Sequence, residues 1–214
     1  TIRKVHEEKI LHQAHYDSLT GLPNRFLALD RLSQILRNAQ REDHQAAVLF
    51  LDLDDFKKVN DTLGHEGGDQ VIEEAARRVR WSVREEDTVG RLGGDEFIVL
   101  LASIPDKAAA AVVGEKILAA FRSVFRLGER EILLTTSIGI SVYPDDGDDP
   151  KLLLRNADTA MYHSKAGGRN AYHFYTDAMN QDVARRLELE EQLHAALENG
   201  EFYLCYQPIV NIYT

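Results

Sequence analysis

The sequence has few of the features that would take it outside the ordinary globular proteins. It contains one cysteine, Cys205, among 214 residues, so no intramolecular disulfide or thiolate metal site can form. The longest apolar run, Ala46–Leu51, is much shorter than the roughly 20 residues of a membrane-spanning helix. No signal peptide is visible. These absences exclude a disulfide scaffold and predict a cytoplasmic location, with any membrane anchor lying upstream of this chain.

Positive charge is also scarce. The chain has 25 Lys and Arg against 35 Asp and Glu, which gives a formal net charge of −10. A protein that grips a nucleic-acid backbone needs a broad basic surface to displace counterions, so no nucleic-acid partner is expected. The same balance still allows a small phosphate ligand to be held by a few well-placed cations.

Several common catalytic motifs are missing. The sequence has no Gly-Lys-Ser/Thr phosphate loop, no G-x-G-x-x-G fingerprint and no G-x-S-x-G nucleophile turn, and its histidines lack zinc-binding spacing. These absences argue against a P-loop nucleotide site, zinc-dependent hydrolysis and triad chemistry.

Apolar periodicity predicts alternating strands and helices. Helices are expected over about 23–40, 66–83, 106–125 and 151–165, and strands over 46–52, 88–91, 97–101, 132–142 and 172–175. This order predicts an α/β (α+β) fold in which one layer of helices packs on a mixed central β-sheet.

The chain divides into four predicted segments. Residues 1–15 read as an N-terminal linker or stalk helix, 16–176 as the main domain, 177–200 as a connecting helix, and 201–214 as the truncated start of another domain, beginning with a strand. The connecting helix is indicated by apolar residues at helical spacing from Leu189 to Leu197.

Two groups of carboxylates fall at strand ends. Asp52, Asp54 and Asp55 follow the first strand, while Asp95 and Glu96 lie at the tip of a hairpin expected beside it. Carboxylates held close together repel one another unless a cation lies between them, and oxygen ligands of this kind suit Mg²⁺. The alternative is that these acids are simply solvated.

Glycines and cations near these carboxylates suggest a phosphate ligand. Gly93 and Gly94 would let a backbone approach phosphates closely, or would only satisfy positive φ angles in the hairpin turn. The candidate phosphate-binding cations are Lys57, Lys58, Lys165 and Arg169. Most Lys and Arg side chains on helices face water, which is the alternative for each of them.

Six blocks of the sequence together resemble a GGDEF domain, the diguanylate cyclase family. The blocks are DSLTGLPNR (17–25), FLDLDDFKKVNDTLGHEGGD (50–69), REED (84–87), RLGGDEF (91–97), SIGIS (137–141) and ADTAMYHSKAGGRN (157–170). Their number and order are far more specific than any single motif. YQPIV (206–210) resembles the opening of an EAL phosphodiesterase domain. The resemblance therefore implies a GGDEF domain over 16–176 and a truncated EAL domain over 201–214.

The resemblance implies a function and a metal site. GGDEF domains have a sheet like that of nucleotidyl cyclases and polymerase palms, and a homodimer condenses two GTP into cyclic di-GMP and two pyrophosphates. Matching positions place Asp52, the Leu53 carbonyl and Asp95 on Mg²⁺ or Mn²⁺, with Glu96 as a further ligand. Either Asp95 or Glu96 would accept the proton of the attacking hydroxyl.

The resemblance also implies substrate and regulatory contacts. The implied guanine contacts are Asn60 and Asp69, with His65 in the same pocket; the implied phosphate contacts are Lys57, Lys165 and Arg169, approached past Gly93 and Gly94. Lys57 would also stabilise charge in the transition state. Arg84 and Asp87 match the R-x-x-D motif that binds cyclic di-GMP and inhibits the enzyme, and a surface ion pair is the alternative for them.

A second function remains open at this point. In proteins that join a GGDEF to an EAL domain, one domain can serve as a regulator. The alternative is therefore a catalytically silent module that binds GTP or cyclic di-GMP and controls an adjacent C-terminal EAL domain. Because Asp52 and Asp95 are both present, the sequence favours an active cyclase.

Overall fold

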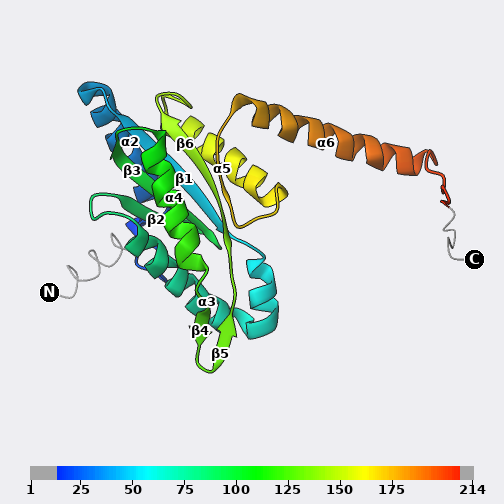
Figure 1. The fold of residues 1–214 in the computed structure, drawn as a ribbon, viewed down its shortest axis with the longest axis horizontal. Helices are drawn as coiled ribbons and strands as arrows, with labels where there is room; N and C mark the ends of the chain where they lie inside the picture. The colour runs from blue at the N-terminus through cyan, green and yellow to red at the C-terminus, as the bar shows by residue number, and fades with distance from the viewer. Residues whose placement is uncertain (1–13, 208–214) are drawn as a thin grey trace, which may run out of the picture. The chain divides into compact units, whose positions relative to one another are not determined.

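The computed structural model describes residues 14–207, and its contacts divide the chain into two compact units at Thr176. The first unit contains four helices of more than ten residues and a central sheet (Figure 1). Its elements are α2 (Arg25–Glu42), β1 (Gln45–Leu53), α3 (Phe56–Ser82), β2 (Thr88–Gly93), β3 (Glu96–Ile104), α4 (Lys107–Phe121), β4 (Phe125–Leu127), β5 (Arg130–Ile132), β6 (Thr136–Tyr143), α5 (Pro150–Ala166) and β7 (Tyr172–Phe174).

The central sheet is mixed, as predicted. Its strand order is β2-β3-β1-β6-β7, and only the outer β6–β7 pair is parallel. The middle strand, β1, is the apolar run QAAVLFLDL, and nearly all of it is buried. A strand that is apolar at successive positions must be covered on both faces, so β1 lies at the centre of the sheet.

Helices cover both faces of this sheet, so the expectation of one helix layer is wrong. Alternate residues of β1, such as Leu49 and Leu51, pack in a cluster with the buried side chains of α3 and α4. The intervening Val48 and Phe50 pack with buried side chains of α2 and α5. The α4 helix lies in front of the strands in Figure 1. The physical reason is the continuous apolar character of β1, which one helix layer would leave half uncovered.

The strand expected over 132–142 is two strands in the structure. Arg130–Ile132 forms β5, which pairs with β4 in a separate two-stranded sheet, while β6 begins only at Thr136. Gly128 adopts a φ of 62°, in the left-handed region, and allows the tight β4–β5 turn. Because the alternation of apolar residues continues through both strands, the sequence pattern did not reveal the break.

The α3 helix begins ten residues earlier than the expected start at 66. It is two helical segments joined at a kink, where Gly64 has φ 73° and ψ 174°. The short first segment carries few apolar residues, so its periodicity was too weak to predict. The other long helices match their expected spans closely, and side chains of Asn24 and Asp149 cap the N-termini of α2 and α5.

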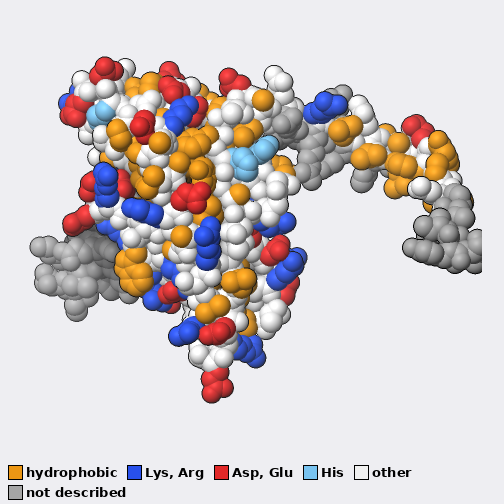
Figure 2. Space-filling view, in the orientation of Figure 1, with side chains coloured by type: hydrophobic (Ala, Val, Ile, Leu, Met, Phe, Trp, Pro, Cys, Tyr) orange, Lys and Arg blue, Asp and Glu red, His pale blue; other side chains and the backbone are white. Residues whose placement is uncertain are grey.

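The second unit contains α6 (Asp177–Glu198), which matches the expected connecting helix. Leu189, Leu193 and Leu197 are exposed on it, and Figure 2 shows hydrophobic side chains along this helix. Residues 201–207 form neither helix nor strand, so the strand expected there is absent from the described part; a strand needs a neighbouring strand for its hydrogen bonds. Residues 1–13 of the stalk helix expected over 1–15, and residues 208–214, lie outside the described residues. No helix within residues 14–207 is long and apolar enough to cross a membrane.

Candidate functional site

Two of the predicted carboxylates lie side by side at the end of the sheet. Asp52 of β1 pairs directly with Glu96 of β3 in the antiparallel register. Directly opposed residues point to the same face with Cβ atoms about 5 Å apart. That face is the one covered by α2 and α5, because Phe50 and Ile98 next to them pack in the same cluster. The hairpin therefore brings the two carboxylates together, as the sequence predicted.

The turn that carries Asp95 requires its two glycines. Gly93 and Gly94 have φ angles of 143° and 53°, in the region that L side chains rarely adopt. The Asp95 carbonyl accepts a hydrogen bond from the Leu53 amide at 3.3 Å, which fastens the tip of the hairpin to the end of β1. The turn thus places Asp95 beside the Asp52–Glu96 pair, with the Leu53 backbone at the same strand end.

An arginine holds this turn to the N-terminal segment. The Arg91 guanidinium donates to the Gly94 carbonyl at 3.0 and 2.7 Å and to the Asp17 carboxylate at 3.0 and 3.2 Å. Burial alone would raise the pKa of Asp17, but hydrogen bonds from Thr20 and then the Arg91 guanidinium hold it below its usual value. The Arg91 backbone amide also donates to the Pro23 carbonyl at 2.9 Å.

The predicted phosphate ligand Lys165 already touches the predicted metal ligand Asp52. Its ammonium nitrogen lies 2.7 Å from Asp52 Oδ1. This contact depends on Gly139 of β6, because a Cβ there would collide with the backbone of Ala157 and Met161, so only glycine lets α5 pack so closely. Burial raises the pKa of Asp52 to about 6; Lys165 opposes this shift, and the nearby Asp95 carboxylate adds to it.

The donor set fits a hard divalent cation. Asp52, Asp95 and Glu96 with the Leu53 carbonyl supply only oxygen atoms, which is the chemistry that Mg²⁺ and Mn²⁺ prefer. Within residues 14–207, however, no three His, Cys, Asp or Glu side chains converge closely enough to hold a metal by themselves. In this structure the Lys165 ammonium lies against Asp52 and supplies the positive charge there. A metal there would therefore need further oxygen ligands, such as substrate phosphates.

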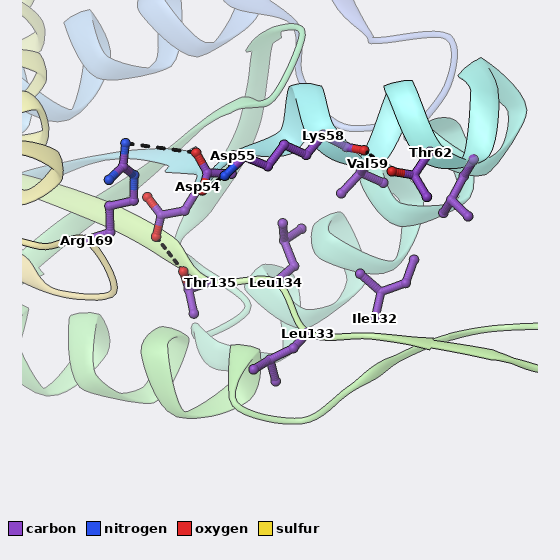
Figure 3. A pocket seen from close by; sticks show the side chains of 11 residues that line it. Asp54, Asp55, Lys58, Val59, Thr62, Ile132, Leu133, Leu134, Thr135 and Arg169 are labelled. Carbon is purple, nitrogen blue, oxygen red and sulfur yellow. Dashed lines mark hydrogen bonds and ion pairs between the residues drawn. The ribbon is translucent and has the colours of Figure 1, made fainter.

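The Asp54 carboxylate is hydrogen-bonded to other segments of the protein. It accepts hydrogen bonds from the hydroxyls of Thr135 (2.6 Å) and Ser137 (2.7 Å) and from the backbone amide of Asn170 (3.1 Å). These bonds hold the start of β6 and the loop after α5 against the end of β1; Figure 3 shows the bond to Thr135. Through the Asn170 amide, Asp54 holds the loop that carries Arg169.

Arg169 and Asp55 lie beside a hollow at the start of α3. Figure 3 shows this pocket of about 370 Å³, which includes Lys58 and the apolar side chains of Val59 and Leu134. The exposed Asp55 carboxylate lies 2.9 Å from Lys58 Nζ and 3.9 Å from Arg169 Nη2. With Lys165 on Asp52, three of the four candidate phosphate cations are thus paired with a carboxylate in this structure, whereas Lys57 is exposed at the same helix start.

The kink in α3 brings two predicted guanine contacts together. Asn60 lies in the segment before Gly64, and Asp69 in the segment after it. The Asn60 side-chain oxygen lies directly against Gly68, where a Cβ would collide with it. Asp69 directly follows Gly68 in the chain, and its side chain and that of His65 are exposed. A polar edge of this kind is open to a ligand.

The predicted inhibitory residues do not form the surface ion pair that was the alternative. The Arg84 guanidinium lies 3.8 Å from Glu86, and 76% of the Arg84 side chain is exposed. Asp87 accepts a hydrogen bond from the Arg84 backbone amide at 3.1 Å, and burial raises the pKa of its carboxyl. Both residues line a cavity of about 500 Å³ that also includes the exposed Trp81.

Two charged residues near Glu96 were missed by the sequence analysis. Arg25 Nη2 lies 3.9 Å from Glu96 Oε2. Burial, followed by the charge of Asp158, raises the pKa of Glu96, while Arg25 lowers it. Arg25 and Asp158 both lie inside sequence blocks described above. Only the packing of α2 and α5 on the same sheet face reveals that they meet Glu96, and no local signal marks it.

Comparisons with known proteins show the family to which the chain belongs. The family profile described as "Diguanylate cyclase, GGDEF domain" matches residues 14–171. The chain is 44% identical over 202 residues to the "Bifunctional diguanylate cyclase/cyclic di-GMP phosphodiesterase MucR" of Pseudomonas aeruginosa; the match covers 94% of this chain and 29% of MucR, so the chain spans less than a third of that relative.

Solved structures show the same fold. The isolated GGDEF domain of TpbB (YfiN) from Pseudomonas aeruginosa superposes with a TM-score of 0.78 at 42% identity, covering 79% of this chain and 99% of that one. The coiled coil and GGDEF domain of DgcB from Caulobacter crescentus, in complex with c-di-GMP, superposes with a TM-score of 0.72 at 27% identity, covering 80% and 91% of the two chains.

Proposed function

Because the chain belongs to the GGDEF domain family of diguanylate cyclases, we propose that it joins two GTP molecules into cyclic di-GMP between two copies of the domain. In each of two steps, a ribose 3′-oxygen forms a bond to the α-phosphorus of the other nucleotide. The bond from that phosphorus to the bridging oxygen of the β-phosphate breaks, and pyrophosphate leaves. The hydroxyl proton passes to a carboxylate at the hairpin.

The observation that carries this proposal is the pair of opposed carboxylates, Asp52 and Glu96, beside an intact Gly-Gly-Asp-Glu turn. A bound Mg²⁺ or Mn²⁺ would neutralise phosphate charge and lower the pKa of the attacking hydroxyl. Asp52, Asp95, Glu96 and the Leu53 carbonyl would hold it. Lys165 would leave Asp52 and bind phosphate oxygens, since its flexible stem allows the ammonium to exchange one anion for another.

The other predicted residues divide the remaining tasks. Asn60 and Asp69 bind the guanine edge, because a carboxylate accepts hydrogen bonds from the N1–H and N2–H groups that adenine lacks. His65 lies at the rim of the same region. Arg169 and Lys57 bind phosphates, with Arg169 exchanging the distant Asp55 contact of 3.9 Å for a phosphate oxygen. A phosphate ligand offers Arg169 a bidentate pair of hydrogen bonds and Lys57 a short ionic hydrogen bond.

Product inhibition is the second part of the proposal. The exposed Arg84 guanidinium and the adjoining cavity of about 500 Å³ suit a phosphate-bearing aromatic ligand. Cyclic di-GMP would bind there and slow the enzyme. In a longer protein, a C-terminal EAL phosphodiesterase domain would be the partner, and the cyclase would oppose its hydrolysis of cyclic di-GMP.

One structural observation supports a different function for the same site. Asp52 is paired with Lys165, and no group of three metal-binding side chains converges within residues 14–207. A site that kept this arrangement would bind GTP without cyclising it. The second candidate is therefore a silent GTP- or cyclic-di-GMP-binding module that regulates an EAL phosphodiesterase domain.

Turnover of GTP separates these functions. The chain is incubated with GTP and Mg²⁺ over a range of protein concentrations, and cyclic di-GMP and pyrophosphate are measured by chromatography. A cyclase gives product that rises faster than linearly with protein, that disappears in Asp95→Asn, and that persists in Asp148→Asn, a matched change at an exposed loop carboxylate. GTP binding without product at every concentration would reject the cyclase and support the regulatory module.

A further inference from the structure

A groove of about 410 Å³ next to the carboxylates has no role in the function proposed above. Helices α2 and α5 supply most of its lining, over the sheet face that carries Asp52 and Glu96. Its apolar lining comes from Leu29, Phe50 and Leu154, and its charged lining from Arg25, Glu96, Lys151, Arg155 and Asp158. None of the residues assigned to the guanine or the phosphates of the chain's own nucleotide lines this groove.

The groove is continuous with the candidate metal site. Glu96 lines the groove and also opposes Asp52 in the sheet. Along α5, Lys151, Arg155 and Asp158 are spaced by four and three residues, and Lys165 follows seven residues later. Residues at these spacings share one face of a helix. One charged face of α5 therefore runs from the groove to the Lys165–Asp52 contact.

The cations of the groove outnumber its two carboxylates, Glu96 and Asp158. Arg25 lies 3.9 Å from Glu96, with 57% of its side chain exposed, and its charge also acts on Asp158, whereas none of the described ion pairs involves Lys151 or Arg155. Three such cations around one hollow are unexpected in a chain with a net charge of −10. Exposed cations on a helix ordinarily need no partner, but these surround a hollow that contains a reacting carboxylate. Phosphate oxygens are the anions that arginine and lysine bind best in that setting.

We propose that Lys151 and Arg155 contact the phosphates of the nucleotide held by a second copy of the chain. This inference rests on the proposed cyclase function, because only a reaction between two nucleotides requires another triphosphate beside this site. The chain's own nucleotide is already supplied with Lys57, Lys165 and Arg169. Glu96 borders the groove, so a second nucleotide that reacts at the hairpin carboxylates would have this groove beside it. Cations supplied across an interface in this way stabilise phosphoryl-transfer transition states in other enzymes.

The test separates binding of the chain's own nucleotide from turnover. The variants are the double change Lys151→Ala/Arg155→Ala and the control Arg126→Ala, which removes a 77% exposed arginine from β4. Affinity is measured by calorimetry with 3′-deoxyGTP, which lacks the attacking hydroxyl and cannot condense. The rate of cyclic di-GMP formation is measured at increasing protein concentration until the rate per chain no longer rises.

The double variant is expected to bind 3′-deoxyGTP within about twofold of the unaltered chain, because its own nucleotide site is intact. Its saturating rate is expected to fall about tenfold or more, as the loss of charge-assisted phosphate contacts predicts. The control should change neither quantity, and thermal melting should show that both variants fold.

Each other result overturns the inference. An unchanged saturating rate would mean that the groove does not act in the reaction. A rate that recovers fully at high protein concentration would assign the two cations to dimer association only. Parallel loss of 3′-deoxyGTP affinity would place them on the chain's own nucleotide. If the unaltered chain forms no product at all, the proposed cyclase function fails and this inference fails with it, whereas the first three results leave that function intact.

Discussion

The Asp17–Arg91 ion pair offers a quantitative test of how the hairpin turn is held in place. The change is Asp17→Asn, which keeps the size of the side chain and removes its charge. The two side chains are only 21% and 12% exposed, so the pair lies between a solvated surface pair and a fully buried one. Exposed pairs contribute about 0–1 kcal/mol and breaking a buried one costs about 3–5 kcal/mol, so we expect a loss of about 2 kcal/mol.

Thermal unfolding followed by circular dichroism measures this loss. For a domain of this size, each kcal/mol corresponds to about 2–4 °C, so Tm should fall by about 6 °C. Because the pKa of Asp17 is lowered in the folded chain, its stabilisation is present above the unfolded pKa of about 4 and is lost as pH falls through the folded value. The difference between the unaltered chain and Asp17→Asn should therefore shrink in acid.

A double-mutant cycle with Arg91→Met isolates the pair from other effects of each change. Arg41→Met is the control, since Arg41 is exposed and its side chain contacts only Asn38 among the described hydrogen bonds. A Tm change of about 1 °C or less in Asp17→Asn, or a coupling energy below about 0.5 kcal/mol, would refute the account of how Arg91 secures the turn.

Two further predictions concern the neighbouring packing. Gly139→Ala should destabilise the chain by about 3 kcal/mol, at the upper end of the cost of overpacking, because the new Cβ meets the backbone of α5. Urea unfolding measures this loss. For comparison, Gly21→Ala shows the cost of backbone strain alone, because φ is +69° there and nothing lies within 4 Å of the new Cβ. Burial and the neighbouring His163 lower the pKa of His173 in the folded chain. The contribution of His173 to stability should therefore be present above the unfolded pKa of about 6.5 and be lost as pH falls through the folded value. Melting curves should show that His173→Gln loses less stability in acid than the unaltered chain, and equal losses would contradict this.

Local signals in the sequence were sufficient for the helices except the first segment of α3, for most strands and for the carboxylate pair. Asp52 and Glu96 were predictable neighbours because the hairpin pattern and the buried strand both placed acids at strand ends. Residues Asn60 and Asp69 were identified by resemblance to a family, and the structure adds the Gly64 kink that places them together.

The remaining features depend on contacts between segments far apart in the chain. Asp54 was grouped with the other strand-end carboxylates, but Thr135, Ser137 and Asn170, more than 80 residues away, occupy its carboxylate. The second helix layer and the Arg25–Glu96 contact have the same origin. Periodicity reports which face of an element is apolar, and it does not report which element covers that face.

The close packing of α5 on β6 also affects how quickly the site can take up a cation. With Gly139 in contact with the α5 backbone, the helix cannot slide to move Lys165 away from Asp52. Only rotation about the side-chain bonds of Lys165 can release the carboxylate, and side-chain rotation at a partly exposed position takes picoseconds to nanoseconds. Entry of a metal and a triphosphate at this carboxylate should therefore proceed at a rate set by their diffusion and dehydration, without a slow conformational step of the domain.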